Sequence, residues 1–265
     1  RKDALKLLDE LEKLGAKNIF HLSTLLCGQH RREVLGQVRE CLEKSQPIKL
    51  ISTQVVEAGV DLDFPAVYRA IGPLERIVQA AGRCNREGSL FERTERLGQV
   101  VVFVPEGGGT PVGDYAKALT EAKIMITNGI DLHDPNIFER YFSTLYSGSE
   151  DRTDQKHIQK LRENFNFPEV AKLFRLIDDD TKPVVVLYNK EAEALIERIR
   201  KRGFLLAREY KALQPFVVNI RSTDFQKNES LIDNKDTGGV NVWHGSYDNK
   251  LRGISFSWSI EDLIV

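Results

Sequence analysis

The sequence predicts an α/β fold in which a parallel sheet is followed by a helical connector and a small α+β domain. Two observations carry this prediction. Up to residue 105, short continuous apolar runs alternate with helical patterns, which is typical of parallel sheets that helices cover on both faces. The glycine-rich break PEGGGTP then interrupts every regular pattern. We therefore place the parallel-sheet domain at residues 1–105, the linker and connector at 106–182 and the C-terminal domain at 183–265.

Apolar spacing predicts each element of the first domain. Leu5, Leu8 and Leu11 recur at helical spacing, so we expect an amphipathic helix over residues 1–14 that ends at Gly15. Uninterrupted apolar residues predict buried strands. The remaining elements that we expect are a short apolar run at 19–22, a helix at 32–44, strands at 48–52 and 67–71, a helix at 74–85 and a strand at 100–104.

The pattern after the glycine-rich break predicts helices first and a mixed module afterwards. We expect connector helices at 114–127, 135–146 and 154–164. Phe138, Tyr141 and Phe142 form an aromatic face on the second of them, which we interpret as a packing surface rather than a platform for stacking bases. The C-terminal elements that we expect are strands at 184–188, 216–220, 240–243 and 254–256, a helix at 191–201 and a polar, mobile loop at 224–239.

Composition argues against several classes of protein. The three cysteines include no Cys-x-x-Cys spacing, which speaks against a disulfide framework or a zinc site and favours a reduced, cytoplasmic setting. The formal net charge of −1 argues against a large flat DNA-binding face, although a local basic groove is compatible with it. We expect no membrane span and no signal peptide. Because the chain starts at Arg1 directly in a helical pattern, we interpret it as a piece of a longer protein.

The first motif with chemical content is TQVVEAGVDLD, which starts at Thr53 directly after a predicted strand. Ligands of open α/β sheets bind at the carboxyl ends of strands, so Thr53 and Gln54 are placed to meet a phosphate. Gly59 gives the backbone freedom before Asp61, whose carboxylate suits a ribose hydroxyl or an arginine of the neighbouring helix. The alternative is an ordinary strand–loop–helix corner of an α/β domain.

The second motif is QAAGRCNR, which starts at Gln79. With spacings of four and three residues, Gln79, Arg83 and Arg86 are predicted to share one face of the helix over 74–85. Two adjacent guanidinium groups suit phosphate oxygens, and an arginine that reaches across a domain cleft stabilises charge during phosphoryl transfer. The alternative is a solvated arginine face that pairs with Glu75 or Glu87.

These segments resemble a known family. TQVVEAGVDLDF followed by IGPLERIVQAAGRCNREG is similar to motifs V and VI of superfamily 2 helicases, in the form found in the helicase-nuclease of type I CRISPR systems. HLSTLLCGQHR, which starts at His21, resembles the preceding motif of that family, which lies beside the bound DNA strand. LQPFVVNI and the final strands resemble its C-terminal domain, most closely the subtype I-C branch. The resemblance covers nearly the whole chain and is most specific at residues 53–88.

The resemblance implies that residues 1–105 are the second RecA-like helicase lobe, incomplete at its N-terminus because its first strand is missing. The DNA-binding residues that it implies are Ser23, Thr24, Arg31, Thr53 and Gln54. The ATP-binding residues that it implies are Gly59, Asp61, Gln79, Arg83 and Arg86, of which Arg83 and Arg86 are catalytic and one is the arginine finger. Arg31 and Arg32 open the following helix and suit backbone phosphates, with a solvated helix start as the alternative. One departure is Ala80, where the family usually has arginine, so one contact of the arginine network is missing or supplied elsewhere.

Other motifs of the family are absent from the sequence. There is no Gly-x-x-x-x-Gly-Lys-Ser/Thr loop for ATP phosphates and no Asp-Glu strand motif for magnesium. We expect ATP and Mg²⁺ to be bound mainly by a first lobe, and the nuclease's divalent metal by a further domain. The dipeptide His133-Asp134 is interpreted as a loop or helix start, so we expect no metal site in this chain.

The expected function is that of the C-terminal part of an ATP-dependent single-stranded DNA translocase and helicase-nuclease, which degrades invading DNA in type I CRISPR interference. The chain alone is expected to be inactive. The implied partners are single-stranded DNA, the RNA-guided surveillance complex and a viral anti-CRISPR inhibitor. Two alternatives stay open: a non-catalytic module that docks on the surveillance complex or an inhibitor, and a lobe of another superfamily 2 helicase that acts on RNA or DNA.

Overall fold

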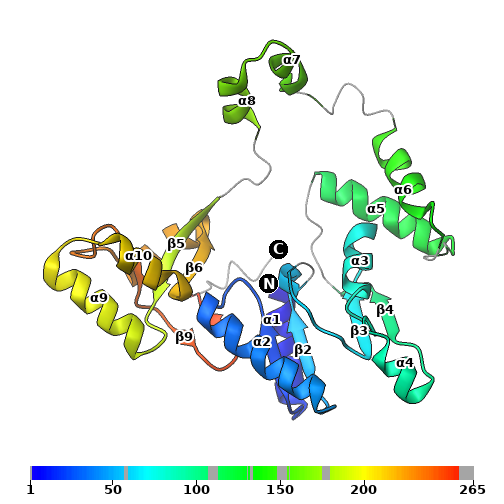
Figure 1. Cartoon of the computed structure of the whole chain (residues 1–265), viewed down its shortest axis with the longest axis horizontal. Coiled ribbons are helices and arrows are strands. Elements are labelled where there is room, and N and C mark those ends of the chain that lie inside the picture. The colour runs from blue at the N-terminus through cyan, green and yellow to red at the C-terminus, as the bar shows by residue number, and fades with distance from the viewer. Residues whose placement is uncertain are drawn as a thin grey trace. The chain divides into compact units, whose positions relative to one another are not determined.

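The computed structural model divides the chain into two compact units (Figure 1). Unit 1 combines Arg1–Val60 with Asp180–Val265, and unit 2 is Asp61–Asp179. The residues that the structure describes are 2–56, 59–106, 113–129, 131, 134–147, 154, 156–174 and 180–256. Unit 1 is therefore discontinuous in sequence. The domain boundaries suggested by the sequence, after residues 105 and 182, stay a prediction.

The first part of unit 1 is built on two parallel strands. Its elements are α1 (Lys2–Lys13), β1 (Ile19–Leu22), α2 (Gly28–Glu43), β2 (Lys49–Ser52) and the 3₁₀ turn η1 (Gln54–Val56). Strand β1 pairs with β2 in parallel register, which confirms the predicted strand type. Helix α2 buries His30, Val34 and Val38, which recur every four residues along one face. It begins at Gly28 rather than at residue 32, because Cys27 already has the extended conformation of an N-cap.

The second part of unit 1 contains a mixed sheet and, among the described residues, three α-helices. Its elements are β5 (Thr181–Val186), α9 (Lys190–Arg202), α10 (Ala207–Leu213), η2 (Gln214–Phe216), β6 (Val217–Arg221), α11 (Ser222–Lys227), η3 (Glu229–Leu231), β7 (Ile232–Asp233), β8 (Val242–Trp243), β9 (Tyr247–Asp248) and β10 (Gly253–Ile254). The strand order is β6-β5-β8-β7, with β9 and β10 as a separate antiparallel pair. The core lies between β5 and α9 and includes Val185, Ile196 and Ile199. Asn189 caps α9 by accepting the amide of Ala192 at 3.0 Å.

The predicted polar loop over residues 224–239 is wrong for most of its length. The end of α11, the turn η3 and strand β7 lie within it. Thr237 is fully buried, and its hydroxyl contacts the carbonyls of Asn234 and Val240 at 2.9 and 2.6 Å. These hydrogen bonds to backbone groups organise a segment that has few apolar residues, which is why apolar periodicity did not reveal it.

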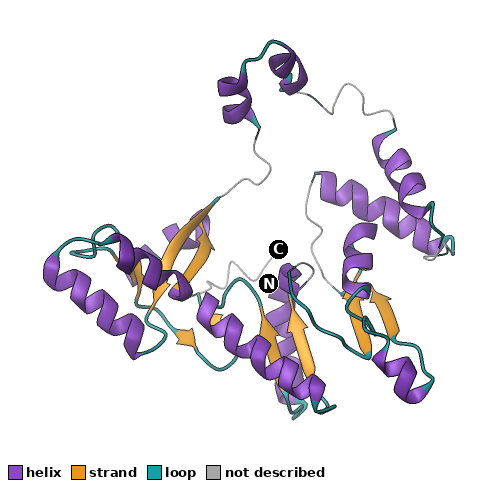
Figure 2. Ribbon diagram, viewed as in Figure 1, coloured by secondary structure: helices purple, strands orange, loops and turns teal. Residues whose placement is uncertain are grey.

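Unit 2 combines a second parallel pair of strands with a set of helices (Figure 2). Its elements are β3 (Ala66–Ala70), α3 (Leu74–Ala81), α4 (Ser89–Thr94), β4 (Gln99–Phe103), α5 (Asp114–Thr127), α6 (Ile137–Tyr146), α7 (Ile158–Glu163) and α8 (Phe167–Leu173). The core joins α3, α5 and α6 through Leu74, Ala118, Ala122, Ile137 and Tyr141. Tyr141 is fully buried and donates its hydroxyl to the carbonyl of Ala118 at 3.1 Å. The predicted packing role is therefore confirmed for Tyr141 and for Phe138, which packs partly buried against the same core, whereas Phe142 is 36 % exposed.

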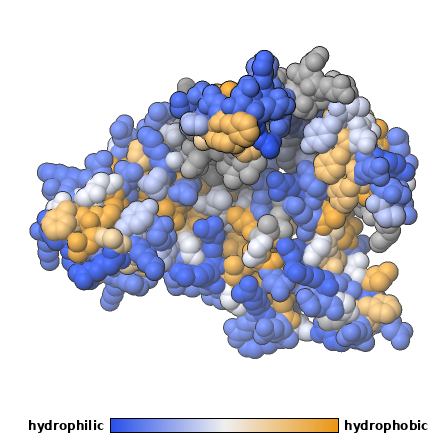
Figure 3. Space-filling model, turned by 45° about the horizontal axis from the view of Figure 1, so that its top comes forward, coloured by the Kyte–Doolittle hydropathy of each residue, from blue (hydrophilic) through white to orange (hydrophobic). Residues whose placement is uncertain are grey.

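Taken unit by unit, the chain has an α/β fold with parallel strand pairs in both units, β1–β2 and β5–β8 in unit 1 and β3–β4 in unit 2. The RecA-like character of the first hundred or so residues stays a prediction. None of the described helices is both long enough and apolar enough to cross a lipid bilayer. Apolar side chains nevertheless reach the surface among polar ones (Figure 3), and in the described residues they include Leu14, Leu97 and Phe165.

Candidate functional site

The arginine motif follows helix α3 instead of lying on it. The helix ends at Ala81, and the amides of Gly82 and Arg83 close its last turn on the carbonyls of Val78 and Ala80 at 2.9 and 3.0 Å. Only Gln79 of the predicted trio is therefore helical. The prediction that Gln79, Arg83 and Arg86 share one helical face is wrong.

A contact with a distant residue explains where the helix ends. The amide of Phe64 donates to the carbonyl of Arg83 at 2.8 Å, and the amide of Asn85 donates to the carbonyl of Phe64 at 2.9 Å. These bonds form a short parallel bridge between Phe64 and Cys84. This pairing requires a non-helical backbone at residues 83–85, so the helix ends before it. Asn85 then has a left-handed conformation with φ of 47°.

Arg86 is held beside two aspartates of the upstream motif. Its Nη1 lies 2.6 Å from Oδ1 of Asp61, and its backbone amide donates to Oδ1 of Asp63 at 2.8 Å. The side chain of Arg86 is 42 % exposed and that of Asp61 is 72 % exposed, so water screens this ion pair strongly. A guanidinium in such a pair can exchange the carboxylate for another anion at little cost. The structure thus brings Asp61 and Arg86 together, as expected for a carboxylate that orients an arginine.

The other candidates of unit 2 lie close by in the sequence. Gln79 is exposed, and its Oε1 accepts a long hydrogen bond of 3.5 Å from Nη1 of Arg76. Arg83 is partly buried. Ala80, where the family usually has arginine, is only 8 % exposed and lies on the face of α3 that also buries Leu74 and Ile77. A small apolar side chain suits this packed face.

The predicted DNA contacts of unit 1 gather where β1 and β2 end. Ser23 and Thr24 directly follow β1, and Thr53 and Gln54 directly follow β2. The amide of Thr53 donates to the carbonyl of Leu22 at 3.0 Å, which holds the two strand ends side by side. Ser23 is fully buried, and its hydroxyl accepts the amide of Leu25 at 3.2 Å. Thr24 and Thr53 are partly buried and Gln54 is exposed, so these three are the accessible ones.

The first turn of α2 adds positive charge to the same region. Arg31 and its neighbour Arg32 line a pocket of about 270 Å³. The other lining residues are Leu22, Gly28, Leu35, Val55 and Val60. A helix N-terminus with two guanidinium groups favours an anion such as a phosphate. The sequence identified both arginines as candidate contacts to backbone phosphates.

Gly59 and Asp61 belong to different units. Gly59 is in unit 1 and has a left-handed backbone with φ of 73°, a conformation that favours glycine. Asp61 opens unit 2. Among the described residues, no three histidine, cysteine, aspartate or glutamate side chains cluster as metal ligands would. His133 of the His-Asp dipeptide lies outside the described residues.

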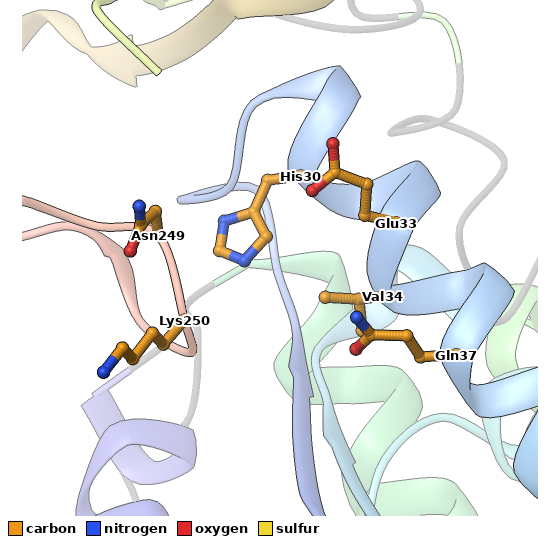
Figure 4. A pocket seen from close by; sticks show the side chains of 6 residues that line it. All are labelled: His30, Glu33, Val34, Gln37, Asn249 and Lys250. Carbon is orange, nitrogen blue, oxygen red and sulfur yellow. The ribbon is translucent and has the colours of Figure 1, made fainter. Parts of the chain in front are cut away.

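A second pocket lies between α2 and the turn that joins β9 to β10 (Figure 4). Its volume is about 290 Å³, and its lining consists of His30, Glu33, Val34, Gln37, Asn249 and Lys250. The ring of His30 is 2 % exposed, stacks on Tyr188 with centroids 5.4 Å apart and places Nδ1 3.0 Å from the hydroxyl of Tyr247. Sequence reasoning missed this pocket because its two sides are more than 200 residues apart in the chain.

Burial lowers the pKa of both His30 and His21 below the usual value of a histidine. Both rings are therefore neutral in the folded chain at neutral pH, and the unfolded chain binds more protons once the pH falls below about 6.5. The stability that these two groups contribute is present above that pH and is lost as the pH falls through their lowered folded values.

We expect the melting temperature of the chain, measured by circular dichroism, to decrease when the pH is lowered from 7.5 to 5.5. The variant His30→Gln should melt at a lower temperature at pH 7.5 but lose less on acidification, because glutamine does not titrate. Equal pH dependence in the parent and the variant would contradict this assignment.

Comparison with known proteins gives one consistent family. Residues 2–89 match the family model of the C-terminal region of CRISPR-associated nuclease/helicase Cas3. Over 73 residues the chain is 51 % identical to the CRISPR-associated nuclease/helicase Cas3 of Haloferax volcanii, a match that covers 27 % of this chain and 8 % of that protein. The matched region is thus a small part of that relative.

Solved structures extend the likeness to most of the chain. The crystal structure of T. fusca Cas3 matches with a TM-score of 0.57 and 15 % identity, over 91 % of this chain and 34 % of that one. Its complex with ATP matches with the same values. A chain of a CRISPR RNA-guided surveillance complex in a pre-nicking state matches with a TM-score of 0.55 and 14 % identity, over 91 % of this chain and 36 % of that one. Such identities show a common fold. The sequence matches and the structural matches lead to the same proteins: residues 2–89 match the C-terminal region of Cas3, and most of the chain is similar in fold to T. fusca Cas3.

Proposed function

We propose that the chain is the part of a Cas3 helicase-nuclease that couples ATP hydrolysis to movement along single-stranded DNA. The observation that carries this proposal is the exposed ion pair between Arg86 and Asp61, in a segment that the family model covers. An arginine finger must be able to leave its resting partner and reach a phosphate that another lobe holds. Arg86 meets this requirement because its pair is screened and partly exposed.

The nucleotide itself would be held mainly outside this chain. The described residues supply guanidinium groups but no phosphate-binding loop and no carboxylate pair for magnesium, so they fit the arginine side of an ATP site only. When bound, ATP would supply the phosphoryl group whose transfer drives the motor. Arg86 and Arg83 would stabilise the negative charge that develops on it, with Gln79 and Asp61 beside them. The motif order supports a superfamily 2 motor.

The DNA strand would follow the carboxyl ends of β1 and β2. Thr24, Thr53 and Gln54 offer accessible polar groups there, and Arg31 and Arg32 offer two positive charges at the first turn of α2. Contacts of this kind read the phosphate backbone and not the base sequence. A translocating motor needs such sequence-independent contacts.

Replacing Arg31 by alanine in the complete enzyme tests the DNA side of the proposal. We expect the Kd for a fluorescein-labelled oligothymidylate, measured by anisotropy, to rise about tenfold, and the dependence of log Kd on log salt to become shallower by about one phosphate contact. Arg39, exposed further along the same helix, provides the matched control Arg39→Ala. Equal affinities of the two variants would contradict the proposal. ATP hydrolysis stimulated by RNA but not by DNA would favour a helicase that acts on RNA.

A second candidate function is docking on an RNA-guided surveillance complex. The observation that favours it is the likeness in fold to a chain of such a complex. A pull-down with the surveillance complex would support it if binding persists after Arg83 and Arg86 are both replaced by alanine. The two functions are compatible within one protein. An anti-CRISPR inhibitor as partner, and a cytoplasmic setting, stay predictions.

A further inference from the structure

The β9–β10 hairpin (residues 247–254) fastens itself to the segment that joins β1 to α2. At its first strand, the hydroxyl of Tyr247 accepts the amide of Cys27 at 3.1 Å and lies 3.0 Å from Nδ1 of His30. At its second strand, the amide of Ile254 donates to the carbonyl of Leu25 at 3.0 Å. The hairpin thus holds the Ser23–Cys27 loop at two points of the backbone and the following helix at one side chain.

The hairpin backbone also approaches this loop more closely than any side chain would allow. Gly253 has φ of +77°, and a Cβ built on it would lie 2.4 Å from the carbonyl oxygen of Leu25. Real Cβ atoms do not come this close to a backbone oxygen, so only glycine fits this position without moving one of the two segments. Gly239 has a similar backbone with φ of +87° but open space around it, which makes it a matched reference position.

Two further contacts orient the hairpin. The carbonyl of Leu251 lies 3.0 Å from Nδ1 of His21 on β1. The guanidinium of Arg252 bonds Asp9 at 2.7 Å and also Glu12, both on α1, and these two carboxylates raise its pKa. The hairpin therefore contacts α1, β1, the Ser23–Cys27 loop and α2. Of these, the loop carries Ser23 and Thr24, and α2 carries Arg31, which are three of the predicted DNA contacts of unit 1.

The hairpin is stiff enough to act as a support. The carboxylate of Asp248 accepts the backbone amides of Lys250 at 2.8 Å and of Arg252 at 3.1 Å, which organises the turn between the two strands. On the other side of the contact, Leu25, Leu26 and Cys27 are each at most 2 % exposed. A buried loop that packs between the rest of unit 1 and a hydrogen-bonded turn has little freedom to move on its own.

We infer that the β9–β10 hairpin positions the Ser23–Cys27 loop and the first turn of α2 for contact with DNA, with Gly253 and Tyr247 as positioning residues. The inference rests on the proposed function, because it takes Thr24 and Arg31 as DNA contacts. Its physical basis is that a charged side chain binds a phosphate well only at the right distance and in the right direction. Here both depend on the backbone conformation where the loop ends and α2 begins. The C-terminal part of the chain would thereby affect DNA affinity without contacting the DNA itself.

The test compares Gly253→Ala with Gly239→Ala in the complete enzyme. Both variants place alanine in a left-handed backbone, but only the first pushes a methyl group against Leu25. We expect Gly253→Ala to raise the DNA concentration for half-maximal ATP hydrolysis about tenfold, with kcat at saturating DNA unchanged, while Gly239→Ala changes neither. A general loss of structure would lower kcat as well.

Two further variants make the outcome decisive. In an Arg31→Ala background, Gly253→Ala should lose most of its effect, because both changes act on the same contact. Tyr247→Phe removes only a hydroxyl and should raise the same DNA concentration about threefold even where Gly253→Ala fails to fold. The inference would be overturned if the effects of Gly253→Ala and Arg31→Ala on this DNA concentration were fully additive. It would also be overturned if Gly253→Ala and Tyr247→Phe both behaved like Gly239→Ala. A silent Arg31→Ala would overturn the proposed DNA site instead.

Discussion

Replacing Arg86 by alanine in the complete enzyme is expected to lower kcat for ATP hydrolysis by a factor of about 10³ at saturating DNA. The reason is that a guanidinium delivered to the transferring phosphoryl group stabilises charge that appears only in the transition state. Nucleotide affinity should change much less, because under the proposed function the phosphates would be held mainly outside this chain. Steady-state turnover and the Kd of a non-hydrolysable ATP analogue, measured on the same preparation, separate the two effects.

Three control variants sharpen this prediction. Arg86→Lys keeps a positive charge but loses the planar fork, so an intermediate rate is expected. Asp61→Ala removes the closer resting partner of Arg86 and leaves Glu87, whose Oε1 lies 4.0 Å from Nε of Arg86. It should cost less than tenfold, since a screened ion pair contributes little. Arg96, an exposed arginine of the same unit, serves as the neutral site Arg96→Ala. Normal turnover of Arg86→Ala would show that the finger is misassigned.

Replacing Tyr141 by alanine is expected to lower the free energy of unfolding of unit 2 by roughly 3–5 kcal/mol, as for other large aromatic side chains in a core. The ring is fully buried in the cluster that joins α3 to α5 and α6, and its hydroxyl satisfies the carbonyl of Ala118. Because α3 carries Gln79 and leads into the arginine segment, the loss would also disturb the candidate nucleotide site. Urea denaturation followed by circular dichroism provides the measurement.

The conservative exchange separates the two contributions of Tyr141. Tyr141→Phe keeps the ring and removes the hydrogen bond, so it should cost roughly 0.5–1.5 kcal/mol. Tyr146 lies one turn further along α6 and is 59 % exposed, so Tyr146→Ala should be close to neutral. Similar losses from Tyr141→Ala and Tyr146→Ala would contradict the view that this face of α6 is a core.

Local patterns predicted the elements whose ends are set by local chemistry. Helix α5 has the predicted bounds of residues 114–127, because helical spacing is uninterrupted there and a glycine-rich segment precedes it. Helix α3 was predicted to run to residue 85, and its true end at Ala81 depends on pairing with Phe64, which lies on another segment. Strands β7 and β9 have only two residues each, so their position depends on partners and not on propensity.

The candidate site also has a part that local sequence predicts and a part that depends on long-range contacts. Motif chemistry pointed to Asp61 and Arg86, which do form a pair, because both lie within a stretch of 26 residues whose pattern is recognisable. The support behind the Ser23–Cys27 loop could not be predicted. The contact between Tyr247 and Cys27 joins residues 220 positions apart, and nothing in either local sequence indicates the other. Long-range contacts of this kind follow from the whole fold.

The discontinuous make-up of unit 1 has a consequence for biosynthesis. Leu25, Leu26 and Cys27 are buried in the folded chain, and a hairpin that is synthesised more than 200 residues later bonds the backbone of this segment. Until residues 247–254 have emerged, the carbonyl of Leu25 lacks the backbone partner that it has in the folded chain. Unit 2 is synthesised in this interval, so it can fold before the second part of unit 1 has been synthesised. Nascent chains stalled before residue 247 should therefore engage chaperones through their N-terminal segment.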